Sequence, residues 1–361
     1  MHKGLVALGA SPKEVQRLLI PKVGEKIDAR GRKLSTQQQI ARQSFNNALR
    51  DGLLREIEVG CPVCGEQEFK HFCTIDRIGL KVQSVMCTRC PTLYSRKRLD
   101  ERSLAVFYST FYREMYTGSS VPTASWFEEQ VSSGRRILNQ LAELGVTRQE
   151  LSGKRILEVG CGSGGILIPF TEIGAEVVGI DFDDTYMVAG RNRGLNLIDR
   201  SIYEFQSDKK FDLIILKDVL EHLPDLDLVL QKLKSLLSET GKVYIQVPTF
   251  EGLEFLGYKN DYLRYFQNAH IVHFSEASLN YLFSKNGFDT VYSDLNGLAL
   301  FGHKDGRESL SFEFENERND SVKRIVNILN RRVKVVAKER IWKLLPKQVV
   351  QLYHLFKKRG A

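Results

Sequence analysis

The central part of the chain alternates short apolar runs with stretches in which apolar residues recur at helical spacing. Such an alternation predicts buried strands joined by helices, as in a parallel sheet that is covered on both faces. The expected strands are 155–159, 176–180, 195–201, 212–216, 242–247, 288–293 and 298–303, with the last one antiparallel. The pattern therefore predicts an α/β fold around a seven-stranded sheet.

The patterns on either side divide the chain further. The predicted segments are a helical N-terminal arm (1–60), a cysteine-rich segment (61–98), a helical cap or linker (99–150), the α/β domain (151–304), and a polar linker with basic amphipathic helices (305–361). In the arm, we expect Thr36 to cap a helix whose apolar face carries Ile40, Phe45 and Leu49.

A glycine-rich loop follows the first predicted strand. Gly160, Gly162 and Gly164 stand between this strand and the next helix, and Asp181 ends the second strand. Glycines let a ligand approach the backbone closely, and an acid at the end of the second strand can hydrogen-bond ribose hydroxyls. The loop therefore indicates a cofactor that carries a nucleoside.

Glu158, just before this loop, narrows the choice of cofactor. Gly160, Gly162 and Gly165 also fit the dinucleotide fingerprint, but a carboxylate here would repel a pyrophosphate and would suit an ammonium group. The stretch resembles motif I of the class I methyltransferases that depend on S-adenosylmethionine (SAM), E-x-G-x-G-x-G. The resemblance implies a Rossmann-like fold and a SAM site made by Glu158, Gly160, Gly162, Gly164 and Asp181.

The carboxyl ends of the third and fourth strands supply further cofactor candidates. Lys217 and Asp218 end the fourth strand, at the edge where α/β sheets bind ligands. The resembled family often places an acid after the third strand to bind the adenine amine. Here Asp199 falls two residues early, so we expect Ile202 to pack on the adenine ring.

Four of the six cysteines form two C-x-x-C pairs, and the N-terminus shows no secretion-signal pattern. In such a chain the pairs favour a metal over disulfides. Two C-x-x-C turns can surround one ion with four thiolates and leave no open position, which is typical of structural zinc. The predicted Zn²⁺ ligands are Cys61, Cys64, Cys87 and Cys90.

Two histidines are candidates for the base that deprotonates an acceptor. His222 belongs to a D-V-L-E-H sequence that resembles small-molecule methyltransferases, and it is expected to open a helix. His270, in NAHIVHFS, matches the substrate-side histidine of sugar methyltransferases, although Ala269 and His273 depart from their pattern. Histidine suits base catalysis near neutral pH, so we take His270 as the first candidate and His222 as the second.

Residues 61–304 together resemble bacterial methyltransferases that join a four-cysteine zinc ribbon to a class I domain, a type found in sugar and polysaccharide biosynthesis. Relatives that methylate sugar carbons have a further C-terminal domain, for which this chain is too short, so we expect O-methylation of a sugar or glycan-type acceptor. Two alternatives remain: an rRNA methyltransferase, and a non-catalytic SAM-binding or zinc-ribbon interaction protein. Against the rRNA enzyme, the chain has no N/D-P-P-Y motif.

The net charge of +8 is unevenly distributed. Residues 321–361 contain twelve Lys or Arg and one acid, whereas residues 61–320 contain 29 and 37. Because the positive charge is concentrated at the ends of the chain, a nucleic-acid-binding surface that extends across the catalytic face is disfavoured. The basic tail either lies on an anionic membrane surface or packs on the body of the protein.

No apolar run reaches the length of a membrane span, so we expect a cytoplasmic protein, peripheral at the inner face of the membrane if the tail binds lipid. The sequence gives no oligomeric state.

Overall fold

The computed structural model describes residues 34–119, 121–254 and 265–304, together with positions 314, 319, 320 and 323. The first 33 residues of the expected N-terminal arm and nearly all of the expected linker and basic helices at 305–361 lie outside the described residues. Among the helices described, none has the length and hydropathy of a membrane span.

The larger sheet has seven strands in the order β11-β12-β9-β8-β5-β6-β7. The strands are β5 (Arg155–Val159), β6 (Glu176–Asp181), β7 (Leu197–Asp199), β8 (Phe211–Lys217), β9 (Leu237–Gln246), β11 (Phe288–Ser293) and β12 (Leu298–His303). Strands β5 to β9 pair in parallel, and β12 is antiparallel to both of its neighbours. The predicted Rossmann-like sheet is confirmed, although the third strand is shorter than expected and the fifth begins earlier.

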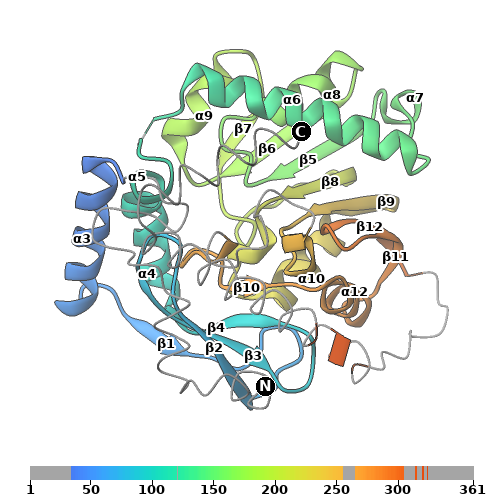
Figure 1. Ribbon diagram of the computed structural model, residues 1–361. Helices are drawn as coiled ribbons and strands as arrows, with labels where there is room; N and C mark the ends of the chain where they lie inside the picture. The colour runs from blue at the N-terminus through green and yellow to red at the C-terminus, as the bar shows by residue number, and fades with distance from the viewer. Residues whose placement is uncertain are drawn as a thin grey trace, which may run out of the picture.

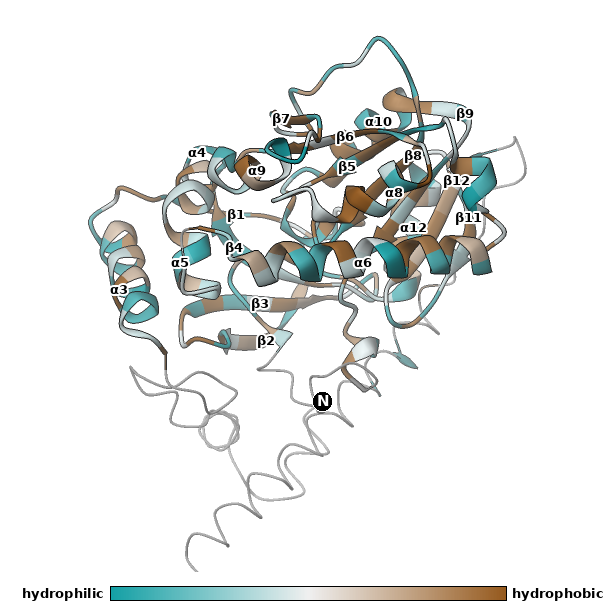
Figure 2. Cartoon of the chain, turned by 90° about the horizontal axis from the view of Figure 1, so that it is seen from above, coloured by the Kyte–Doolittle hydropathy of each residue, from teal (hydrophilic) through white to brown (hydrophobic). Residues whose placement is uncertain are grey.

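Helices cover both faces of this sheet (Figure 1). One face packs against α6 (Ala124–Glu143), α7 (Arg148–Leu151), α8 (Ile168–Glu172) and α9 (Asp184–Arg191), and the other against α10 (Leu226–Leu236) and α12 (Glu276–Lys285). Successive residues of a strand point to opposite faces, so Leu213 joins the first core and Ile214 the second. Both faces are buried, which explains the nearly unbroken apolar strands that Figure 2 shows in brown.

A smaller antiparallel sheet lies beside the first (Figure 1). Its strands are β1 (Glu56–Glu58), β2 (Phe69–Ile75), β3 (Lys81–Cys87), β4 (Leu93–Leu99) and β10 (Val272–His273). Strand β10 comes from the segment just before α12, and Val272 pairs with Tyr94 of β4. The cysteine-rich segment is thus joined to the large domain by a shared sheet, which the sequence did not predict.

Helices form a cap at one end of the molecule (Figure 1). They are α3 (Thr36–Arg50), α4 (Glu101–Val106), the π-helical turn η1 (Phe107–Tyr112) and α5 (Arg113–Tyr116). Ser35, rather than Thr36, is the N-cap of α3, because its side chain accepts a hydrogen bond from the amide of Gln38. The expected apolar position Ile40 is 60% exposed, since the buried face of α3 runs through Ala41, Phe45 and Ala48.

Candidate active site and cysteine cluster

The loop after β5 is held in a shape that requires glycine. Gly160 has a φ of +70°, and a Cβ at this position would lie 2.5 Å from the side chain of Val219. The amides of Gly160 and Cys161 both donate to the carbonyl of Ile180 on β6, at 2.8 and 3.1 Å. The loop is therefore fixed between the end of β6 and the segment that follows β8, and its backbone can face a ligand.

Gln130, on α6, holds the other side of the glycine loop. Its amide nitrogen donates to the carbonyl of Cys161 at 3.1 Å, and its side-chain oxygen accepts from the amide of Gly165 at 3.2 Å. This residue was missed by the sequence reasoning, because no local motif connects it to a loop thirty residues away.

Two buried acids face this loop. Asp181 accepts hydrogen bonds from the amides of Gly162 at 2.8 Å and Asp183 at 3.0 Å. Glu158 is 2% exposed, and its Oε2 has no hydrogen-bond partner among the described residues. Burial, and then the charge of Asp181, raises the pKa of Glu158 well above its usual value, and burial also raises the pKa of Asp181. A buried carboxyl without a partner fits a cationic ligand group, so Glu158 suits the ammonium of SAM and Asp181 its ribose.

The other predicted cofactor residues lie at the same edge of the sheet. Lys217 and Asp218 form an ion pair at the end of β8. Among the described non-glycine residues, Asp218 alone has a positive φ, +55°. This backbone strain is common at binding sites. Ile202 follows β7 and is buried in the core on the α10 side of the sheet. Its expected contact with adenine stays a prediction.

The cap reaches over the loop that follows Asp181. Arg113 of α5 forms a 3.2 Å ion pair with Asp183, and its guanidinium lies 3.9 Å from the centre of the Tyr186 ring. Both charged side chains are largely buried, so this contact is better protected from solvent than a surface pair. The ring of Tyr108 also lies 5.6 Å from that of Phe182. The cap therefore forms one wall of the cofactor side of the site.

The structure brings the two candidate bases together. The rings of His222 and His270 are 4.7 Å apart, and Nδ1 of His222 lies 2.9 Å from both the Ala269 carbonyl and the Tyr108 hydroxyl. The amide of Ile271 donates to the carbonyl of Glu221 at 2.9 Å, which fixes the two segments to each other. The expected helix at His222 is instead a single 3₁₀ turn, η3 (Leu220–His222), and α10 begins only at Leu226.

Both histidines are uncharged at neutral pH. Burial lowers the pKa of His222 to about 4 and holds the pKa of His270 well below its usual value. Glu221 is fully buried beside them, with its Oε1 3.8 Å from Nε2 of His270, and burial followed by the charge of Asp218 raises its pKa. Neutral imidazoles can accept a proton or bind a metal.

A buried acid of the smaller sheet positions the His270 segment. Asp76 accepts hydrogen bonds from the amides of Ile78 and Leu80 in its own hairpin. Its other oxygen accepts from the amide of Asn268 and from the hydroxyl of Tyr116, both at 3.1 Å. Tyr116 thus bonds to Asp76, whereas its neighbour Tyr112 has its ring 5.9 Å from that of His222.

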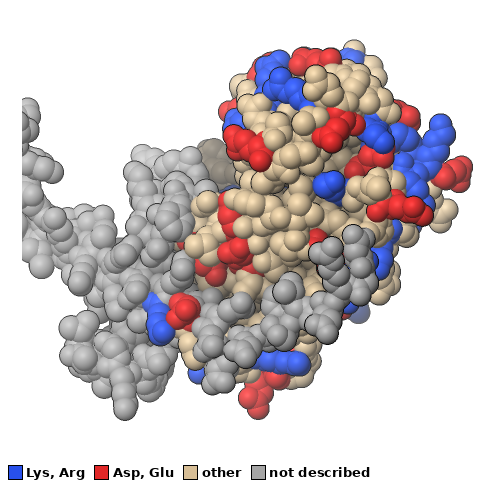
Figure 3. Space-filling model, turned by 90° about the vertical axis from the view of Figure 1, so that its right-hand side faces the viewer, with Lys and Arg blue, Asp and Glu red and all other residues tan. Residues whose placement is uncertain are grey.

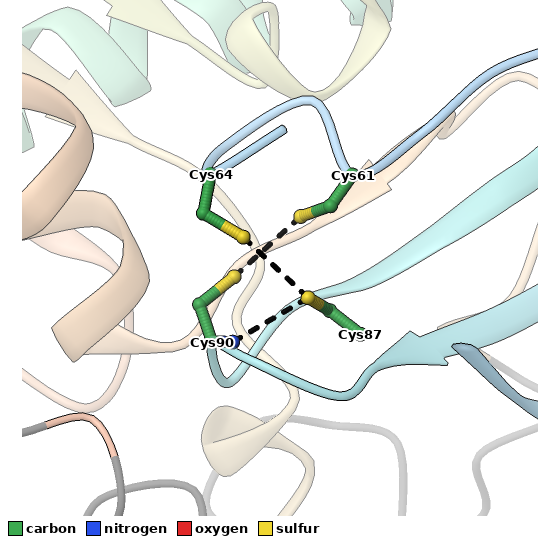
Figure 4. A group of neighbouring side chains, drawn as sticks. All are labelled: Cys61, Cys64, Cys87 and Cys90. Atoms are coloured by element: carbon green, nitrogen blue, oxygen red, sulfur yellow. Dashed lines mark hydrogen bonds between the residues drawn. The ribbon is translucent and has the colours of Figure 1, made fainter. Parts of the chain in front are cut away.

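The four predicted metal ligands form one cluster (Figure 4). The sulfur atoms of Cys61 and Cys90 are 3.5 Å apart, as are those of Cys64 and Cys87, and all four thiols are free. A tetrahedral site with Zn–S bonds of about 2.3 Å has sulfur atoms about 3.8 Å apart, close to these separations. The amides of Arg89 and Cys90 point at the Cys87 sulfur, as is common for metal-bound thiolates. The cluster therefore fits a zinc ion.

His273, in β10 of the smaller sheet, should make the free energy of unfolding depend on pH. The side chain is 1% exposed, and burial lowers its pKa to about 3. The unfolded chain, with a pKa near 6.5, takes up the proton first, so the stability from neutral His273 is complete above about pH 6.5 and is lost as the pH falls towards 3. Relative to His273→Phe, we expect the natural protein to lose about 2 kcal/mol of unfolding free energy between pH 7 and pH 5. Urea unfolding at both pH values measures this.

The aromatic neighbours Tyr265 and Phe266 should accommodate the phenylalanine ring. Exchange of the exposed His71 for phenylalanine is the control and should leave the pH dependence unchanged. Parallel stability curves for the natural protein and His273→Phe would contradict the prediction.

Comparison with known proteins identifies the large domain. Residues 127–293 match the family model described as a methyltransferase domain. The ubiquinone biosynthesis O-methyltransferase of Rhodopseudomonas palustris (strain TIE-1) is 31% identical over 97 residues, which are 25% of this chain and 38% of that protein. The enzyme of the same name from Bradyrhizobium sp. (strain ORS 278) is 33% identical over 101 residues, 26% of this chain and 40% of that one. The chain thus matches about two fifths of the length of these relatives.

Solved structures of methyltransferases are also similar to the chain. Magnesium protoporphyrin IX methyltransferase (ChlM) from Synechocystis PCC 6803 with bound SAH has a TM-score of 0.39 at 18% identity, covering 56% of this chain and 98% of that one. The CcbJ methyltransferase from Streptomyces caelestis has a TM-score of 0.38 at 12% identity, covering 47% and 89%. The family match, the strand order and the glycine loop with its two acids agree with one another. Residues 127–293 form a class I SAM-dependent methyltransferase domain.

Proposed function

We propose that the protein transfers a methyl group from SAM to a hydroxyl oxygen of a small-molecule or glycan acceptor. The observation that carries this proposal is the histidine pair beside the cofactor loop. His222 and His270 are in ring contact, and Val219, in the same segment as His222, lies against Gly160 of that loop. An alcohol needs its proton removed as it attacks, and this pair is placed to activate it.

The names of the relatives support oxygen as the methylated atom. The two curated relatives described above are O-methyltransferases by name, although the match spans only 38–40% of their length. A sugar or polysaccharide acceptor is the finer proposal. Its support is the resemblance of the cysteine-rich segment and of His270 to sugar-modifying methyltransferases.

One face of the protein lacks the concentration of positive charge that RNA binding would need. On the face drawn in Figure 3, Lys and Arg are interspersed with Asp and Glu instead of forming one basic patch. A nucleic-acid surface would concentrate positive charge to bind phosphates. The rRNA alternative is therefore the weaker one and becomes an outcome of the test below.

Separate residues of the chain would bind the cofactor and accept the proton of the acceptor. Bound SAM supplies an electrophilic methyl group on a sulfonium centre. Glu158 would pair with its ammonium, and Asp181 would accept hydrogen bonds from its ribose. With Nδ1–H of His222 donated to the Ala269 carbonyl, its Nε2 keeps a lone pair for the acceptor. Holding the acceptor oxygen in line with the methyl group can supply much of the acceleration.

We further propose that Cys61, Cys64, Cys87 and Cys90 hold a structural Zn²⁺. Four thiolates leave no open position, so this ion has no part in methyl transfer. Its role is to stabilise the small sheet, which through β10 and Asp76 positions the segment that carries His270.

Exchange of the two histidines tests the proposed activity. In His222→Gln and His270→Gln, we expect kcat with a hydroxylated acceptor to fall about 10²- to 10⁴-fold, because the group that activates the oxygen is lost. SAM binding, measured by calorimetry, should change little. The assay measures S-adenosylhomocysteine release with nucleotide sugars, phenols and an rRNA fragment as acceptors.

The exposed His71→Gln is the matched control and should retain full turnover. Undiminished turnover in the double histidine variant would contradict the proposed role of the pair. Methylation confined to the rRNA fragment would replace the small-molecule acceptor by RNA.

A further inference from the structure

Three side chains with metal-binding atoms meet between η3 and the segment before β10. Glu221, His222 and His270 each present one ligand atom, and these atoms lie within 4.8 Å of one another. Two of the residues are adjacent in the chain and the third comes from another segment. The hydrogen bond from Ile271 to the Glu221 carbonyl holds the two segments in place. The cluster is thus assembled in advance by the fold.

Glu221 is the residue that requires explanation. Its side chain is fully buried, and neither carboxylate oxygen accepts a hydrogen bond from another described residue. The nearby ammonium of Lys217 is paired with Asp218 instead. A buried carboxylate without a partner is costly, so proteins that retain one usually give it a cation.

The two histidines have ring nitrogens that can face an ion. Nε2 of His270 lies 3.8 Å from the Glu221 carboxylate and against the side-chain amide of Gln267, and Nδ1 of His270 has no hydrogen-bond partner among the described residues. His222 can donate Nδ1–H to the backbone carbonyl of Ala269, which leaves Nε2 as its available donor atom. A backbone carbonyl that fixes one ring nitrogen is the usual support of a metal-binding histidine.

We propose that Glu221, His222 and His270 bind one divalent transition-metal ion. Two imidazole nitrogens and one carboxylate suit Zn²⁺, Mn²⁺ or Fe²⁺ better than Ca²⁺ or Mg²⁺, which prefer oxygen ligands. Three protein ligands leave coordination positions open, unlike the closed four-cysteine site. The site goes beyond the proposed function. Its use rests on that function: with an ion bound, Nε2 of His222 would hold the metal, and the ion, in place of the free imidazole, would lower the pKa of the acceptor hydroxyl.

Manganese is the probe that separates this site from the cysteine cluster. The full-length protein, with its cysteine site loaded with Zn²⁺, is titrated with Mn²⁺, and the electron paramagnetic resonance signal of the free ion is followed. We expect one Mn²⁺ to bind per chain, because Mn²⁺ prefers oxygen and nitrogen to thiolate. Glu221→Gln and His270→Gln should each weaken binding by more than about tenfold, since loss of supporting partners alone costs that much. Glu239→Gln, at an exposed carboxylate of the same domain, should bind as the natural protein does.

A measurement of thermal stability distinguishes loss of the metal site from failure of a variant to fold. Mn²⁺ should raise the Tm of the natural protein and of Glu239→Gln, because binding to the native state alone stabilises it. It should not raise the Tm of Glu221→Gln, whose neutral amide keeps the shape of the side chain. Natural protein that binds no Mn²⁺, or equal binding by Glu221→Gln and His270→Gln, would overturn the site. These measurements need neither SAM nor acceptor, so their failure is distinguishable from failure of methyl transfer.

Discussion

In Cys87→Ser, bound zinc should be lost, and methyl transfer should fall much more than SAM affinity. Cys87 ends β3, which pairs with β4, and β4 pairs with β10 just after His270. The binding energy of a structural zinc site is folding energy of its surroundings, about 10–16 kcal/mol in small zinc-dependent domains. Removal of a ligand should therefore loosen the small sheet and the segment at 268–273. The glycine loop, held by β6 and α6, should remain in place.

Three measurements on Cys87→Ser test this expectation. Elemental analysis gives the zinc content, hydrogen exchange gives the opening of β2 to β4 and β10, and calorimetry gives SAM affinity. Cys73→Ser is the matched control, because Cys73 lies in β2 of the same sheet and outside the four-sulfur cluster. Full zinc content in a Cys61/Cys64 double variant would exclude the four-cysteine site.

The second large effect is expected in the cofactor site. Asp181→Ala removes a buried carboxylate that bonds to the Gly162 amide and that we propose to accept hydrogen bonds from the ribose of SAM. Loss of a charged hydrogen-bond partner costs roughly 1.5–3 kcal/mol, so SAM affinity should fall about ten- to a hundredfold. Calorimetry with SAM measures this. In Asp208→Asn, an exposed carboxyl in the loop before β8, the affinity should not change. Binding of NAD without binding of SAM would contradict the assignment of the loop.

Strand positions were predictable where apolar runs had clear ends. The strands at 155–159, 288–293 and 298–303 have the predicted bounds, because each is a compact run next to a turn or a glycine. The glycine loop and the two acids beside it, Glu158 and Asp181, were also predictable, because they belong to one local motif.

The prediction of a helix that begins at His222 was wrong, and the reason is local. Pro224 disfavours helical backbone in Leu223, which is extended with ψ of 128°. Asp225 then caps a new helix by accepting a hydrogen bond from the Leu228 amide at 3.0 Å. These signals are present in the sequence, but the apolar spacing across them concealed the break.

The rest of the site depends on contacts between distant segments. Gln130, Arg113 and Asp76 act through partners that lie far away in the sequence. Their types are also common on surfaces, so no periodicity or motif distinguishes them. His222 and His270 could be chosen one by one, but their contact follows from pairing that involves β10, which is only two residues long.

The shared strand also has a consequence for the order of folding during synthesis. Chains emerge from the ribosome N-terminus first, and domains generally fold as units. Strand β4 precedes its partner β10 by about half the length of the chain, because Tyr94 pairs with Val272. Closing so long a loop is entropically costly until the intervening segments have folded. The small sheet is therefore completed only after the strands of the large domain up to β9 have been made, and until then one edge of β4 lacks this partner.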